Sequence, residues 1–85
     1  MNKHFSDDAL EDYLYWQPND KAILKRINKL IRNVEREGYF KGIGKPEPLK
    51  HNLSGCWSRR INDEHRLIYR INENYILIAS CKDHY

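Results

Sequence analysis

The first 40 residues carry apolar side chains at intervals of three and four, which is the spacing of amphipathic helices. Ser6 and the two aspartates after it predict a helix start, because a hydroxyl caps free backbone N–H groups and acidic residues suit the positive end of a helix. We expect a short first helix over about residues 7–16, ended by Pro18. The pair Asn19–Asp20 then begins a second helix, which Gly38 ends.

The second half of the chain has the alternating and continuous apolar runs that are typical of strands. Glycines and prolines interrupt residues 38–55, so we expect a long loop there, without helix or regular strand. Residues 1–5 are a candidate for an additional edge strand. These elements predict an α+β fold, with two N-terminal helices packed on a twisted antiparallel sheet of about four strands. Three strand-like segments, joined by short polar turns, form the meander of this sheet: residues 56–61, 66–71 and 75–81.

The length of 85 residues indicates one domain, residues 1–85, and the content of 40% hydrophobic residues favours a globular fold over disorder. The longest apolar stretch, residues 75–81, is too short to span a membrane, and no apolar signal segment follows Met1, so we expect a cytoplasmic protein without a membrane partner. The two cysteines are too few for a disulfide framework, and no cysteine or histidine pair has zinc-ligand spacing. We therefore expect no metal and no other cofactor.

The net charge of +3 is unevenly distributed along the chain. Residues 41–70 contain seven lysines and arginines against three acidic residues, an excess of four positive charges in the middle of the chain. Such a basic patch suits a partner that carries phosphates, but a solvated surface explains it equally well. The polar face of the second helix is also cationic and is open to the same two interpretations.

The basic segment and the C-terminus together contain the groups needed to cleave RNA without a metal. That reaction requires a base for the 2′-hydroxyl proton, cations for the phosphorane and an acid for the departing 5′-oxygen. Glu47, whose direction is restricted by a proline on each side, is the candidate base, and His84 is the candidate acid. Arg66, with Lys50 and Arg60, provides candidate cations. The attack is intramolecular and leaves a 2′,3′-cyclic phosphate.

Each of these residues also has an ordinary explanation. Glu47 fits an exposed charge in a turn. Arg59 and Arg60 alternate along one strand, so one can point to the exposed face while the other points toward the helices or an edge. Ion pairs with the acidic turn that follows would explain such arginines as well. A C-terminal histidine is usually exposed or held by structural hydrogen bonds, and Tyr85 fits a packed aromatic residue at the end of the sheet.

Several motifs, in this order, resemble the YoeB family of RelE-like toxins from bacterial type II toxin-antitoxin modules. The resemblance implies a RelE-like or microbial-ribonuclease-like fold and an endoribonuclease that cuts mRNA in the ribosomal A site. It also implies three partners, namely a cognate antitoxin protein, the 70S ribosome with its mRNA, and a second copy in a homodimer. The motifs cover nearly the whole chain: residues 12–17 (DYLYWQ), 44–55 (GKPEPLKHNLSG), 57–61 (WSRRI), 64–67 (EHRL) and 84–85 (HY).

On the matching positions, the resemblance implies a role for each site residue. Glu47 would be the general base, and Arg66 would stabilise the transition state. His84 would be the general acid, and Tyr85 would help to position the substrate. An alternative with the same fold is a toxin that binds and blocks the ribosome or another target without chemistry. The candidate substrate-binding residues are the cations of the same segments: Lys45, Lys50, Arg59 and Arg60.

Three features depart from the family's pattern. Residues 37–40 form a connection that is one residue longer, Cys56 replaces a commoner aromatic or aliphatic residue, and Asp83 stands where an aromatic residue is frequent. None of them removes a candidate catalytic group. We expect Asp83 to pair with a neighbouring cation.

Overall fold

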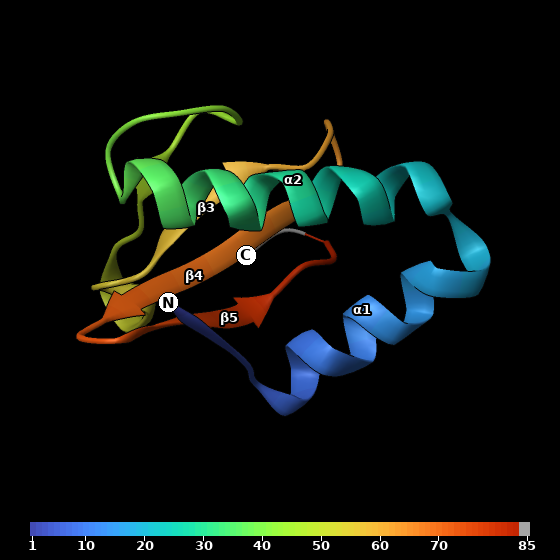
Figure 1. Ribbon diagram of the computed structural model, residues 1–85, viewed down its shortest axis with the longest axis horizontal. Coiled ribbons are helices and arrows are strands. Elements are labelled where there is room, and N and C mark those ends of the chain that lie inside the picture. Colours follow the sequence, from blue (N-terminus) through green and yellow to red (C-terminus); the bar gives the residue numbers. More distant parts are fainter. Residues whose placement is uncertain (84–85) are drawn as a thin grey trace.

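The computed structural model describes residues 1–83, in which two helices pack against one face of a five-stranded sheet (Figure 1). This confirms the predicted α+β architecture. The strands lie in the order β1-β5-β4-β3-β2 across the sheet. Along the chain the elements are β1 (Asn2–Phe5), α1 (Asp7–Asn19), α2 (Lys21–Glu37), β2 (Glu47–Pro48), a 3-10 helix (His51–Leu53), β3 (Trp57–Arg60), β4 (Arg66–Asn72) and β5 (Tyr75–Ser80).

Both helices begin where the sequence predicts. The Ser6 hydroxyl accepts a hydrogen bond from the backbone N–H of Ala9 at 3.1 Å. The Asp20 carboxylate accepts in the same way from two N–H groups in the first turn of α2, each at 3.1 Å. Gly38 ends α2 with a φ of 80°, in the left-handed region that favours glycine.

Helix α1 is longer than predicted, because Pro18 lies inside its last turn and does not end it. Proline has no backbone N–H, but at this position it removes only one bond of the helix. The backbone N–H of Asp20 still donates to the carbonyl of Trp16, at 2.9 Å, so the helix continues to Asn19.

The sheet is mixed, whereas the sequence predicted an antiparallel one. Residues 1–5 do supply an edge strand, β1, but it runs parallel to β5. The predicted loop over residues 38–55 also contains β2 and the 3-10 helix, which the prediction excluded. A proline is compatible with β2 because this strand is at the edge of the sheet, where a missing N–H costs no ladder bond.

The hydrophobic core lies between α2 and the sheet, with part of α1 closing one side. The helix face predicted from the spacing of three and four supplies Ile27 and Leu30, which are both fully buried. Tyr69 of β4 is also fully buried, and Trp57 of β3 is half-buried against the same core. In residues 1–83, no helix is long and apolar enough to cross a membrane.

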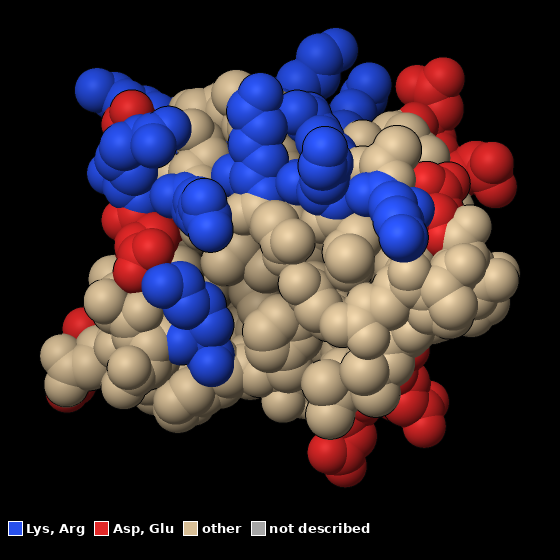
Figure 2. All heavy atoms as spheres, turned by 45° about the vertical axis from the view of Figure 1, so that its right-hand side comes forward, with Lys and Arg blue, Asp and Glu red and all other residues tan. Residues whose placement is uncertain are grey.

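Helix α2 carries a row of exposed cations that line a hollow of about 470 Å³. Figure 2 shows lysine and arginine side chains gathered across the upper part of the molecule, where α2 lies. Within residues 1–83, none of these four cations takes part in an ion pair. We call this surface the α2 groove, and its four cations are Lys25, Lys29, Arg32 and Arg36.

Candidate active site on the outer face of the sheet

Strand pairing brings the candidate base and two arginines to the same face of the sheet. Glu47 of β2 lies opposite Ser58 of β3, and Arg60 of β3 lies opposite Arg66 of β4. Residues opposite one another share a face, and alternate residues of a strand return to it. Glu47, Arg60 and Arg66 therefore lie on the face away from the helices, which we call the outer face.

The spacing on this face suits a phosphodiester between the base and the cation. Glu47 and Arg66 are two strands apart and offset by two residues in register, which places their Cα atoms about 12 Å apart. Their side chains together span most of that distance. In the described part of the chain neither side chain forms an ion pair, so the two are not locked to each other.

The cross-strand pair of Arg60 and Arg66 concentrates positive charge beside Glu47. Like charges directly opposite each other on a sheet are destabilising, and a bound phosphate relieves the repulsion. The Arg66 guanidinium is oriented by its Nη1, which donates to the carbonyls of Asn62 at 2.7 Å and His65 at 3.1 Å. Its Nε and Nη2 have no hydrogen-bond partner among residues 1–83, which leaves them available for phosphate oxygens.

Two of the candidate substrate-binding lysines, Lys45 and Lys50, flank Glu47 in the chain. Glu47 is exposed and, with Lys50, lines a hollow of about 330 Å³ formed by residues 47–53. Lys45 is exposed and does not line this hollow. The loop before it joins the sheet at Gly44, whose carbonyl accepts from the backbone N–H of Arg60 at 2.7 Å.

The candidate acid His84 and its neighbour Tyr85 lie outside the described residues. The residue before them, Asp83, is described, and its backbone carbonyl accepts from the backbone N–H of Arg66 at 3.1 Å. The chain thus passes directly beside the backbone of Arg66 just before it reaches His84. The Asp83 carboxylate pairs with Lys82 at 3.4 Å, which confirms the expected pairing with a neighbouring cation.

Comparison with known proteins identifies the family to which this arrangement belongs. Residues 5–85 match the family described as "YoeB-like toxin of bacterial type II toxin-antitoxin system". The chain belongs to this family. It is 57% identical, over the full length of both chains, to the toxin YoeB of Escherichia coli K12.

Solved structures of YoeB toxins have the same fold. The YoeB-YefM complex from Staphylococcus aureus includes a chain that is 55% identical, with a TM-score of 0.94, over 100% of this chain and 98% of that one. The structure of the YoeB dimer from the same organism matches with 56% identity and a TM-score of 0.94, over the same shares. The family and the fold agree with the resemblance found in the sequence.

The toxin's Arg59 requires a correction, because the prediction that it binds substrate does not fit its position. Its side chain is fully buried on the helix side of β3. All five guanidinium N–H groups are used inside the protein. They donate to the Tyr69 hydroxyl, the Asn33 side-chain oxygen and the carbonyls of three loop residues, Gly38, Lys41 and Ile43. Arg59 therefore fastens the loop before β2 to the core.

Asn33 is the partner of Arg59 that the sequence analysis missed. It lies among the buried residues of α2 and accepts from the Ile43 backbone N–H at 3.0 Å as well as from Arg59. A polar residue at an apolar position of a helix pattern was the available signal, because a buried amide needs a partner. Burial raises the pKa of the Tyr69 phenol, and the hydrogen bond from Arg59 opposes that shift only in part.

The Cys81 thiol is a potentially reactive group that lies in the core, away from the outer face of the sheet. Burial, reinforced by the negative charge of Asp12, raises the pKa of the Cys81 thiol to about 12. This thiol therefore stays protonated at neutral pH and is a poor nucleophile. Within residues 1–83, no group of three or more histidine, cysteine, aspartate or glutamate side chains is placed to hold a metal ion.

Proposed function

We propose that this toxin is a ribosome-dependent endoribonuclease that cuts mRNA in the ribosomal A site by metal-free acid–base catalysis. The observation that carries the proposal is the arrangement on the outer face. A carboxylate, Glu47, and a cross-strand arginine pair, Arg60 and Arg66, share that face, and the chain passes beside Arg66 immediately before His84. A family member that only blocks its target would need no such combination.

In the proposed reaction, Glu47 takes the proton of the 2′-hydroxyl, and the 2′-oxygen attacks the adjacent phosphorus. Arg66 and Arg60 stabilise the negative charge that develops on the phosphorane. His84 gives its proton to the departing 5′-oxygen. The products are a 2′,3′-cyclic phosphate and a 5′-hydroxyl end. Tyr85, Lys45 and Lys50 assist by holding the RNA.

The solved relatives support a proposal about the toxin's protein partners. Because S. aureus YoeB has been solved both with YefM and as a dimer, we propose that this chain also binds a cognate antitoxin and forms a homodimer. Acidic side chains of the antitoxin would complement the basic segment of residues 41–70. Ribosomes are cytoplasmic, so the proposal also places the toxin in the cytoplasm.

The proposal is tested by incubating the purified toxin with ribosomes programmed with a defined mRNA. We expect discrete cuts within the A-site codon, which primer extension maps. The new ends should carry a 5′-hydroxyl, so a kinase should phosphorylate them without prior phosphatase treatment. The same mRNA without ribosomes is the control. Arrested translation on intact mRNA would contradict the proposal and support the non-catalytic alternative.

The α2 groove provides a second surface for phosphates, away from the outer face of the sheet. We expect glutamine at Lys25, Lys29 and Arg32 together to weaken ribosome binding and to reduce the slope of log affinity against log salt by about two to three. Turnover at saturating ribosome concentration should change little, because these residues are remote from the scissile bond.

The matched control for this prediction is Lys21→Gln, an exposed lysine on the same helix that does not line the groove. We expect its salt dependence to be close to that of the unmodified toxin. An unchanged salt slope in the triple variant would show that the groove does not contact the ribosome.

A further inference from the structure

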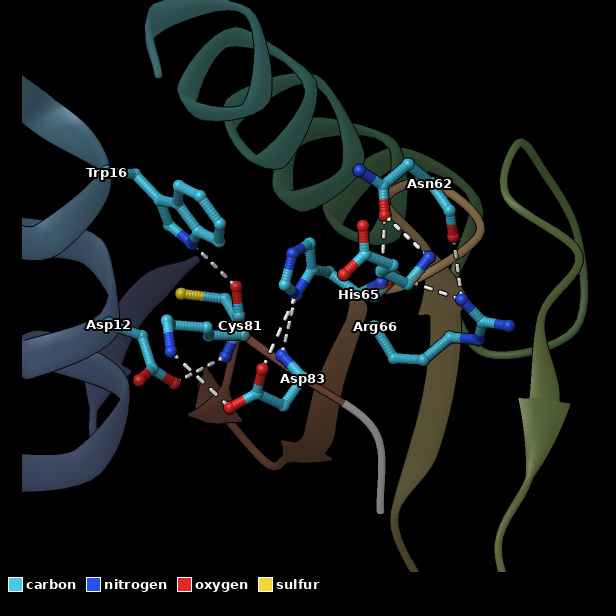
Figure 3. A network of polar contacts seen from close by, with 9 residues as sticks. Asp12, Trp16, Asn62, His65, Arg66, Cys81 and Asp83 are labelled. Carbon is cyan, nitrogen blue, oxygen red and sulfur yellow. Dashed lines mark hydrogen bonds and ion pairs between the residues drawn. The ribbon is translucent and has the colours of Figure 1, made fainter. Parts of the chain in front are cut away.

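The last described residue, Asp83, is held through both of its backbone groups by two consecutive residues of the β3–β4 hairpin. Its N–H donates to the Nδ1 atom of His65 at 2.8 Å (Figure 3). Its carbonyl accepts from the backbone N–H of Arg66 at 3.1 Å. The Asp83 carboxylate is 3.8 Å from the same Nδ1, which is too long for a hydrogen bond. The contact with the imidazole is therefore made by the backbone.

His65 itself is firmly placed. Its side chain is only 12% exposed, and its ring packs edge-on against the Trp16 indole of α1, with centroids 4.9 Å apart. Its own carbonyl accepts from the backbone N–H of Ile61 at 3.0 Å, and the Asn62 side chain accepts from its N–H at 2.8 Å. Nδ1 accepts the Asp83 N–H in the tautomer of the ring that carries its own N–H at Nε2.

The chain between β5 and Asp83 is also held by hydrogen bonds to its backbone, in this case from side chains of α1. β5 ends at Ser80, and side chains of α1 then replace the ladder bonds of the sheet. Trp16 Nε1 donates to the carbonyl of Cys81 at 2.9 Å, and the Asp12 carboxylate accepts from the N–H of Cys81 at 3.0 Å. Asp83 then adopts a left-handed φ of 62°, which turns the backbone.

We propose that His65 is a positioning residue for the C-terminal acid. By accepting the Asp83 N–H, it sets the direction in which the chain delivers the next residue, His84, to the phosphate at Arg66. Because His65 and Arg66 are adjacent in the chain, the same turn that carries the proposed transition-state cation also holds the Asp83 backbone. The inference rests on the proposed function, in which His84 protonates the departing 5′-oxygen.

Two substitutions at His65 distinguish the effect of losing the hydrogen-bond acceptor from the effect of losing the volume of the ring. In His65→Asn, the side-chain oxygen can occupy the place of Nδ1 and accept the same hydrogen bond, whereas His65→Leu has no acceptor. We expect kcat on programmed ribosomes to fall by about 10- to 100-fold in the leucine variant, because misplacement of a catalytic group by about 1 Å has effects of that size. The KM of this variant should change less than about twofold. The asparagine variant should recover most of kcat.

A change in the backbone tests the same hydrogen bond without altering any side chain. Cys81 allows residues 81–85 to be attached as a synthetic peptide by ligation at its thiol, with an ester in place of the amide between Lys82 and Asp83. The ester lacks the N–H that His65 accepts. We expect this protein to show the same loss in kcat as His65→Leu, and it remains informative if the leucine variant does not fold. A kcat equal to that of the all-amide ligation product would overturn the inference.

The decisive readout is a substrate in which sulfur replaces the 5′-oxygen at the scissile bond, because a thiolate leaves without a proton. If His84 is the acid and His65 positions it, both His84→Ala and His65→Leu should regain nearly full rate on this substrate. Recovery of His84→Ala without recovery of His65→Leu would overturn the positioning role and leave the acid assignment intact. If His84→Ala does not recover, the acid assignment itself fails, and the positioning role fails with it.

Discussion

Alanine at Glu47, Arg66 or His84 should each reduce cleavage of ribosome-bound mRNA by at least about 100-fold, with no change in the circular dichroism spectrum. The expected loss follows from the roles of the three groups, since general acids and bases contribute about 10²- to 10⁴-fold and a transition-state cation about as much. Glu47 is exposed and without an ion pair among residues 1–83, so its removal should leave the fold intact. Single-turnover rates on programmed ribosomes provide the measurement.

The control for the loss at Glu47 is Glu73→Ala, which removes an exposed carboxylate from the turn between β4 and β5. Its cleavage rate should match that of the unmodified toxin. Ribosome binding by the inactive variants, measured by co-sedimentation, should remain within a few-fold. Undiminished cleavage in all three alanine variants would refute the assignment of the site.

Alanine at Arg59 should destabilise the toxin severely, by about 4 kcal/mol or more in the free energy of unfolding. The guanidinium satisfies five buried or half-buried acceptors, and each acceptor left without a partner costs about 1–3 kcal/mol. Domains of this size are stable by only about 5–10 kcal/mol, so a loss of this size removes a large share of the total stability. Urea denaturation followed by circular dichroism measures the change.

The neighbouring Arg60 is the matched control, because it is on the same strand but faces solvent on the outer face. Arg60→Ala should change the free energy of unfolding by no more than about 0.5 kcal/mol, as is usual for exposed positions. Its cleavage rate should fall, whereas its stability should not. Equal stability of the two alanine variants would show that the buried network is unimportant for folding.

The local pattern of the chain was sufficient for the elements and the fold class. Helix starts at Ser6 and Asp20 and the end at Gly38 depend on contacts within a few residues, which is why they could be predicted and are confirmed. The strands after residue 55 were predicted for the same reason. The chemical types of the candidate site residues, and their resemblance to the YoeB family, were also visible in the chain.

The placement of those residues depends on contacts between distant segments. The pattern of the chain showed that Arg59 and Arg60 point to opposite faces, but only packing against α2 determines that Arg59 is the buried one. In the same way, only strand pairing shows that β1 runs parallel to β5 and that Glu47 shares a face with Arg66. Periodicity is a property of neighbouring residues, whereas register and burial arise when segments far apart in the chain meet.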